Sequence, residues 1–222
     1  MLAYKRIPHR VIRLLPGPHP VLVRLAGFRR WTVPALDLGS RKVQGTMAIA
    51  RALEELAPDP PLFPADRSQR ARVEAAERWG EAELQPLPRR IFRFALLRDR
   101  TLRRWMAEEV YGLPAPRAAA VLALPMVRAL AGVVRAEEAQ VRDDVRTLPL
   151  VLDRVDELMA EGTIGGPAPN AADFQILSSV RVMLEFSSLA HQVEGRPAAA
   201  AARRLFPRWT SPPVPATTGL PA

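Results

Sequence analysis

The chain has 222 residues, of which 48% are hydrophobic and 25% are charged, and its formal net charge is +9. This composition is typical of a globular protein with a sizeable core and excludes a disordered or fibrous chain. The sequence holds no cysteine, which excludes disulfides and a cysteine nucleophile and favours a cytoplasmic location. We expect no membrane span, because the longest apolar run, residues 118–134, is interrupted by Pro125 and Arg128.

The positive charge comes almost entirely from arginine, since Lys5 and Lys42 are the two lysines. The arginines are scattered in an Ala- and Pro-rich chain, as a GC-rich genome would encode, and no nucleic-acid recognition module is visible. We therefore expect no nucleic-acid partner. Residues 1–36 are nevertheless basic without one acidic residue, so an anionic ligand or partner there stays open. The three histidines show no metal-ligand spacing, and we expect no metal: His9, His19 and His191.

The first 57 residues mix strand and helix signals. Residues 7–15 are β-branched and aliphatic and end at Pro16, which predicts a strand, and a short helix follows over residues 20–25. Residues 32–36 and 41–44, joined by a turn, predict a β-hairpin. Pro34 in its first arm cannot donate to a ladder, so it must lie at a bend or an unpaired edge, where a cis bond is accessible. A helix is predicted from Thr46 to the proline cluster that begins at Pro58.

From Ser68 onward the pattern is helical only. One apolar stripe, interrupted by Pro86 and Pro88, predicts a long kinked helix, and it consists of Val73, Ala76, Gly80, Leu84, Leu87 and Ile91. Further helices are predicted over residues 102–111, 117–135 with a bend at Pro125, 141–159 and 197–205, before a proline-rich tail over 207–222 that we expect on the surface or loose.

The sequence around Asn170 marks the start of a helix by more than one signal. Asn170 can accept from amides of the first turn, and Asp173 can accept from the amide of Asn170, as in a capping box. Its body, residues 174–186, is apolar on nearly every side, which places it at the centre of a bundle. We interpret Asn170 and Asp173 as structural.

These features, in this order, resemble the glutathione S-transferase family. The matching pieces are Val33-Pro34-Ala35-Leu36, Gln44-Gly45-Thr46-Met47-Ala48-Ile49, Pro61-Leu62-Phe63-Pro64 and Pro169-Asn170-Ala171-Ala172-Asp173. The resemblance implies an α+β protein with a thioredoxin-like domain over residues 1–57, a linker over 58–68 and an all-helical domain over 69–206. It also implies a homodimer.

The resemblance implies a glutathione site in the first domain, at Thr32, Val33, Pro34, Gly45 and Thr46. The main chain of Val33 would pair with the extended tripeptide, and the helix start at Thr46 would receive its γ-glutamyl carboxylate. The electrophile site is expected on the following helix, at Trp79, Glu83 and Arg90, with core packing as an equal alternative for Trp79. Glutathione would be the co-substrate.

Two departures from the family pattern affect this interpretation. Gly45 replaces an acidic residue, so one contact to the ligand's ammonium group is lost. The chain also lacks the family's first strand and most of its first helix, which carry the thiol-activating residue, so the catalytic residue is unknown and Tyr4 is not its equivalent. We expect the natural protein to begin upstream of Met1.

Two functions stay in competition. The first is an enzyme that conjugates glutathione to small electrophiles or uses it to reduce them. The second is a non-catalytic relative that binds glutathione without turnover, which the missing segment and Gly45 favour. A nucleic-acid-binding protein, suggested by charge alone, ranks third.

Overall fold

A computed structural model describes residues 1–14 and 18–207. The structure is mostly helical with one small antiparallel sheet, which agrees with the α+β class at this coarse level. The elements, in chain order, are α1 (His19–Leu25), β1 (Ala35–Asp37), β2 (Lys42–Gln44), α2 (Thr46–Leu56), α3 (Arg67–Trp79), η1 (Gly80–Leu84), α4 (Pro86–Arg98), α5 (Arg100–Trp105), η2 (Met106–Val110), α6 (Pro116–Leu122), α7 (Leu124–Val133), α8 (Glu138–Ala160), α9 (Ala171–Met183), α10 (Ser187–Val193) and α11 (Pro197–Leu205).

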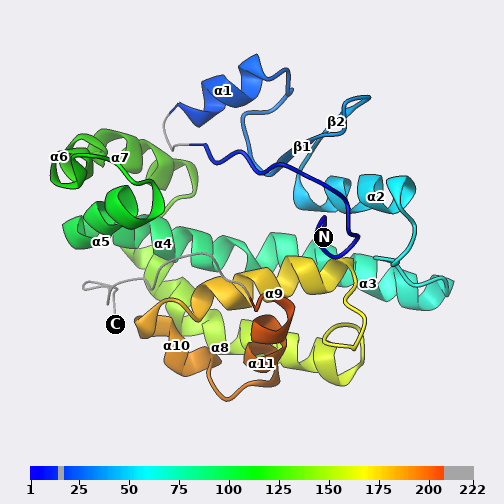
Figure 1. Cartoon of the computed structure of the whole chain (residues 1–222). Coiled ribbons are helices and arrows are strands. Elements are labelled where there is room, and N and C mark those ends of the chain that lie inside the picture. The colour runs from blue at the N-terminus through cyan, green and yellow to red at the C-terminus, as the bar shows by residue number, and fades with distance from the viewer. Residues whose placement is uncertain (15–17, 208–222) are drawn as a thin grey trace.

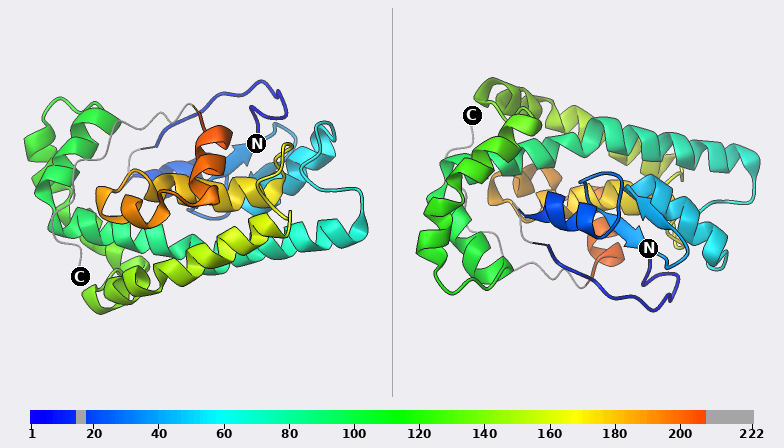
Figure 2. Two further views of the ribbon diagram at one scale, coloured as in Figure 1. Left: turned by 90° about the horizontal axis from the view of Figure 1, so that it is seen from below. Right: turned by 90° about the horizontal axis from the view of Figure 1, so that it is seen from above.

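The helices form a bundle with the N-terminal elements above it. Figure 1 shows α1, the hairpin and α2 over one side of the bundle, and the view from above in Figure 2 shows them over α9, with α3 and α4 running alongside. Ile49, Ala50 and Leu53 of α2 belong to the same core as the buried residues of α3, α4, α8, α9 and α11. The N-terminal segment therefore shares its core with the bundle.

The strand predicted over residues 7–15 is wrong for residues 7–14, which have no regular structure, while Leu15 lies outside the described residues. Val11 and Ile12 are 72% and 71% exposed. A β-branched run forms a strand only when its N–H and C=O groups find a partner. The sheet of the described residues has two strands, β1 and β2, and neither pairs with this segment.

The predicted hairpin is confirmed, although it is shorter than expected. β1 and β2 are antiparallel, with Leu36 opposite Val43, and pairing begins at Ala35. The Val33–Pro34 bond before it is cis, and Pro34, which has no N–H, stays outside the ladder. The side chain of Gln44 holds the preceding segment, because its Nε2 donates to the carbonyls of Arg30 (2.8 Å) and Thr32 (3.1 Å).

Lys5 fixes the N-terminal residues to the end of α2. Its side chain is fully buried, and its Nζ donates to Glu54 Oε2 (2.7 Å) and to the carbonyls of Ala57 (2.5 Å) and Pro60 (2.8 Å). Glu54 in turn accepts from the amide of Leu62 (2.9 Å). Helix α2 and the chain that follows it are thereby tied to residues 1–6.

The predicted long helix is present as α3, η1 and α4, and all six residues of its predicted apolar stripe are buried. Its interruption is a π-helical turn. The amide of Gln85 donates to the carbonyl of Gly80, five residues back, at 2.9 Å. Pro86 and Pro88 have no N–H to continue the ordinary ladder, which accounts for a turn of this kind beside them. Helix α3 begins at Arg67, inside the predicted linker, where the side chain of Asp66 accepts from the amide of Gln69.

The remaining helices follow the sequence expectations with a few differences. Residues 102–111 form the end of α5 and η2, and residues 117–135 form α6 and α7, which meet at an angle of 49° close to Pro125. Helix α8 starts three residues earlier than predicted, and α11 has the predicted bounds. The proline-rich tail lies outside the described residues, except for Pro207.

The capping box of α9 is confirmed. Asn170 Oδ1 accepts from the amides of Ala172 (2.9 Å) and Asp173 (3.2 Å), and Asp173 Oδ2 accepts from the amide of Asn170 (2.9 Å). Asp173 also accepts from the amide of Gly165 (2.6 Å). The predicted body over 174–186 ends earlier, at Met183, but its residues are almost all buried, so α9 is the central helix of the bundle.

Candidate functional site

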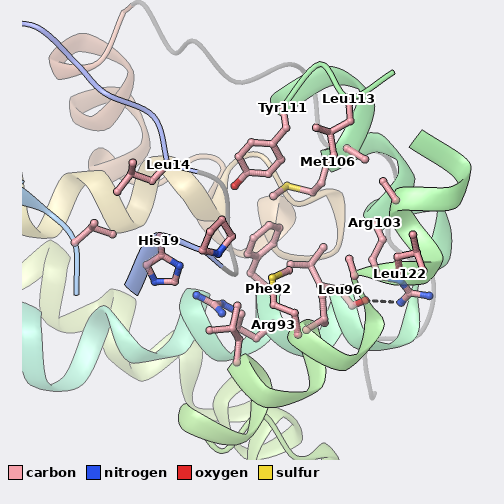
Figure 3. Close-up of a pocket in the computed structure, with 18 of the residues that line it drawn as sticks. Leu14, His19, Phe92, Arg93, Leu96, Arg103, Met106, Tyr111, Leu113 and Leu122 are labelled. Carbon is pink, nitrogen blue, oxygen red and sulfur yellow. Dashed lines mark hydrogen bonds between the residues drawn. The ribbon is translucent and has the colours of Figure 1, made fainter. Parts of the chain in front are cut away.

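A cavity of about 740 Å³ lies where the N-terminal segment faces the α4–α7 end of the bundle (Figure 3). Ile12, Leu14, Pro18, His19 and Val33 line it from the N-terminal side. From the bundle it is lined mainly by apolar side chains, among them Phe92, Leu96, Met106, Leu113, Leu122, Met126, Val127 and Leu130. Its size and apolar lining suit a small organic ligand.

The polar side chains of this cavity carry positive charge or can donate hydrogen bonds. They are His19, Arg89, Arg93, Arg103 and Tyr111, and no aspartate or glutamate is among the described lining residues. A cavity with cations and no carboxylate favours a ligand that brings negative charge of its own.

The three arginines of the cavity differ in their partners. Arg103 donates to the carbonyls of Ala120 (3.0 Å), Leu96 (2.6 Å) and Leu97 (3.0 Å), so it ties α4 to α6. Arg89 donates to the side-chain oxygen of Gln85 at 2.8 Å. Arg93 has no hydrogen bond or ion pair with any residue in the described part of the chain.

Burial and the charge of Arg93 shift the pKa values of the titratable groups that line the cavity. Burial lowers the pKa of Arg93, and the neighbouring charge of Arg89 lowers it further. Burial also lowers the pKa of His19, with the charge of Arg93 as a second cause. The pKa of Tyr111 is raised by burial, although Arg93 acts in the opposite direction. Near neutral pH His19 is therefore uncharged and Tyr111 keeps its hydroxyl proton, while an arginine stays a cation.

The structure brings the predicted glutathione residues together. The amide of Gly45 donates to the carbonyl of Pro34 at 3.0 Å, which sets the start of α2 directly beside the Val33–Pro34 bend. Val33 is 56% exposed and lines the cavity. Thr32, next to it, is exposed and its carbonyl accepts from Gln44.

The start of α2 is open to a ligand. Its N-cap is Gly45, whose φ of 89° requires glycine, and not Thr46, which is the first helical residue. No side chain of the described residues caps this helix, and its first turn holds no acidic residue. The amides of Thr46, Met47 and Ala48 therefore point out of the helix without an intrahelical acceptor, a position that favours an anion.

The residues predicted to contact the electrophile do not line the cavity. Arg90 forms a two-point ion pair with Asp144 of α8, Glu83 is exposed in η1, and Trp79 packs against the main core. The side chains of α4 that do line it are Arg89, Phe92, Arg93 and Leu96, which share one face at spacings of three and four. That spacing is visible in the sequence, but the elements that cover this face are not.

Sequence reasoning also missed the contributions from distant elements. His19 of α1, Met106 of η2, Tyr111 directly after η2, and Met126 of α7 reach the cavity from different segments of the chain. No local pattern marks them, because each is an ordinary residue of its own helix or turn. Among the described residues, no group of three or more His, Asp or Glu side chains could hold a metal ion.

Comparison of the sequence with protein-family models found no match, and comparison with curated proteins found none. Within residues 1–14 and 18–207, no single helix has both the length and the apolar character needed to cross a membrane. The bent pair α6 and α7 meets both criteria only when its two helices are taken together.

Proposed function

We propose that this protein is a glutathione S-transferase-type enzyme, with a thioredoxin-like N-terminal part, that holds glutathione beside Val33 and Pro34 and a small electrophile in the adjoining cavity. One observation carries the proposal. The hydrogen bond from Gly45 to Pro34 joins the exposed bend to the open start of α2, and Val33 is at the same time part of the cavity wall. A ligand bound at the bend would therefore reach the cavity.

Each residue of the bend has a physical role in this proposal. The main chain of Val33, which has no hydrogen-bond partner among the described residues, would pair with the cysteinyl main chain of the tripeptide. The amides that open α2, with the hydroxyl of Thr46, would receive the γ-glutamyl carboxylate. Thr32, Pro34 and Gly45 would shape the contact through their backbones.

The proposed chemistry is nucleophilic attack by the glutathione thiolate. A carbon–sulfur bond forms at the electrophilic carbon, the thiol proton passes to solvent, and a halide or other leaving group departs with the bonding electron pair. The apolar wall of the cavity would exclude water from the reacting thiolate and electrophile. We further propose that the enzyme is a cytoplasmic homodimer.

A second function, glutathione binding without turnover, is favoured by one specific observation. Residues 7–14 form no strand, and the described sheet has only β1 and β2, so the described residues lack the strand-to-helix junction that carries the thiol-activating residue in the family. The bend at Val33 and Pro34 would then be a binding site alone.

Two measurements on the full chain test these functions. Calorimetric titration with reduced glutathione is expected to show binding, and the rate of glutathione conjugation to a chlorodinitrobenzene separates the enzyme from the binding protein. Thr46→Val should weaken glutathione binding about tenfold, since hydrogen bonds to charged groups contribute roughly 1.5–3 kcal/mol. Thr46→Ser, which keeps the hydroxyl, is the matched control. A chain that does not bind glutathione at all contradicts both functions.

A further inference from the structure

The strongest unexplained feature of the molecule is the side chain of Arg93. Helix α4 carries four arginines, and the other three each have a side-chain partner: Arg89 bonds Gln85, Arg90 pairs with Asp144, and Arg98 pairs with Glu138. Arg93 lines the cavity and has no such partner among the described residues. Arg89, itself a cation, acts on it instead and lowers its pKa beyond the effect of burial.

The side chain of Arg93 is half-buried in a mostly apolar cavity, so its guanidinium loses part of its hydration without gaining a partner among the described residues. Removing a cation from water without a compensating partner is unfavourable, and buried charges are normally paired. The downward shift of the pKa of Arg93, caused first by burial, has the sign expected for such a group. Proteins retain a group of this kind where a ligand supplies the missing charge.

The groups around Arg93 suit one particular kind of partner. Figure 3 draws His19 near Arg93 and the hydroxyl of Tyr111 turned into the space that the cavity side chains surround. Tyr111, whose pKa burial raises, keeps its proton and can donate it to an oxygen anion. His19 Nδ1 is buried without a hydrogen-bond partner among the described residues, so it is a second polar atom that a ligand could satisfy.

The rest of the cavity is apolar and large enough for a hydrophobic body. Met106, Met126 and Leu130 lie in the part built by η2 and α7, and methionine side chains adapt to ligands of different shape. A simple inorganic anion would leave this surface without a partner, and a neutral apolar molecule would leave Arg93 without one.

We propose that the cavity binds an apolar carboxylic acid, with its carboxylate against Arg93 and the hydroxyl of Tyr111 and its hydrophobic body among the side chains of η2 and α7. A guanidinium binds a carboxylate through two parallel hydrogen bonds, which gives the site specificity for the acid group. The role of this acid as the acceptor of glutathione rests on the function proposed above. Its binding requires only the cavity.

The test is calorimetric titration of the full chain, without glutathione, with decanoate, decanol and decyltrimethylammonium at the same neutral pH. The three probes share one apolar chain and differ in the charge of the head group. Decanoate is expected to bind at least tenfold more tightly than decanol, and decyltrimethylammonium more weakly than either. These titrations of the unmutated protein are sufficient to overturn the proposal. They do so if the three probes bind equally, if the cation binds best, or if decanoate does not bind.

Two arginine substitutions on the same helix then locate the effect. Arg93→Met keeps the apolar stem and removes the charge, so the preference for decanoate over decanol should fall to about one while decanol binding persists, which also shows that the variant is folded. Arg98→Met removes the same charge outside the cavity and should retain the preference. If Arg93→Met still prefers decanoate over decanol, the carboxylate does not bind Arg93 and the proposal fails. Glutathione binding, measured separately, fails or succeeds independently of these outcomes.

Discussion

Arg90 of α4 and Asp144 of α8 join their two helices through a two-point ion pair. Arg90 Nε lies 2.6 Å from Asp144 Oδ2, and its terminal nitrogen lies 2.7 Å from Oδ1. The carboxylate side chain is only 4% exposed. The pKa of Arg90 is raised, first by this hydrogen bond. The pair thus holds the wall of the cavity by fixing α4 against α8, while the face of α4 that carries Arg93 stays free for a ligand.

Removal of Arg90 should therefore lower stability strongly. Arg90→Met leaves the buried carboxylate of Asp144 without a cation, and we expect a loss of about 3 kcal/mol in the free energy of unfolding. The matched control is Arg98→Met, because Arg98 pairs with Glu138 across the same two helices while both side chains are about half exposed. The control should lose no more than about 1 kcal/mol. Urea denaturation of the two variants measures the difference, and equal losses would contradict this role of Arg90.

Gly80 should resist substitution because α9 passes directly over it. A Cβ atom at Gly80 would lie 2.8 Å from Ile176 Cγ1 and 3.3 Å from Gln175 Cγ. Alanine favours a helix over glycine by about 1 kcal/mol, but overpacking of a core costs roughly 1–3 kcal/mol, so Gly80→Ala should be destabilising.

The chain offers a matched control for this glycine. Gly132 of α7 is exposed and a Cβ atom there would meet nothing within 4 Å, so Gly132→Ala should be neutral or stabilising by up to about 1 kcal/mol. Thermal denaturation compares the two variants. A Gly80→Ala protein as stable as the Gly132→Ala protein would show that α9 does not approach η1 this closely.

The features that the sequence predicts correctly are those decided within a few residues. The capping box needs only Asn170 and Asp173, three positions apart, and the apolar stripe through Gly80 needs only helical spacing. The hairpin is likewise local, since β1 and β2 are separated by a four-residue turn. In each case the interacting residues lie close together in the sequence.

The features that the sequence does not predict depend on partners from elsewhere. Residues 7–14 have the composition of a strand but no neighbour to pair with, so tertiary context overrides their propensity. Arg90 and Arg93 lie three positions apart on one helix, and no local pattern distinguishes them. Their roles differ because Asp144 of α8 packs against Arg90, whereas Arg93 faces the cavity. The thioredoxin-like domain, glutathione and the homodimer stay predictions for the experiments described above.

Glu77 should give the protein a measurable pH dependence. Its side chain is fully buried on α3, and Arg51 of α2 lies 2.8 Å from Oε2. Burial nevertheless raises the pKa of Glu77 above its ordinary value of 4.5, with the ion pair to Arg51 only partly opposing that effect. In the folded protein this carboxyl group therefore holds its proton at pH values where the unfolded chain has released it.

The direction of the effect follows from proton linkage. Between about pH 4.5 and the raised pKa, the folded state binds more protons than the unfolded state, so stability falls as the pH rises, by at most about 1.4 kcal/mol per pH unit. Glu77→Gln cannot titrate, and its free energy of unfolding should fall less over this range than that of the unmodified protein. Glu109→Gln, at an exposed position, should keep the full dependence. Urea denaturation at several pH values from about 4.5 to 7 measures the three curves, and parallel curves for Glu77→Gln and the unmodified protein would show that burial does not hold this proton.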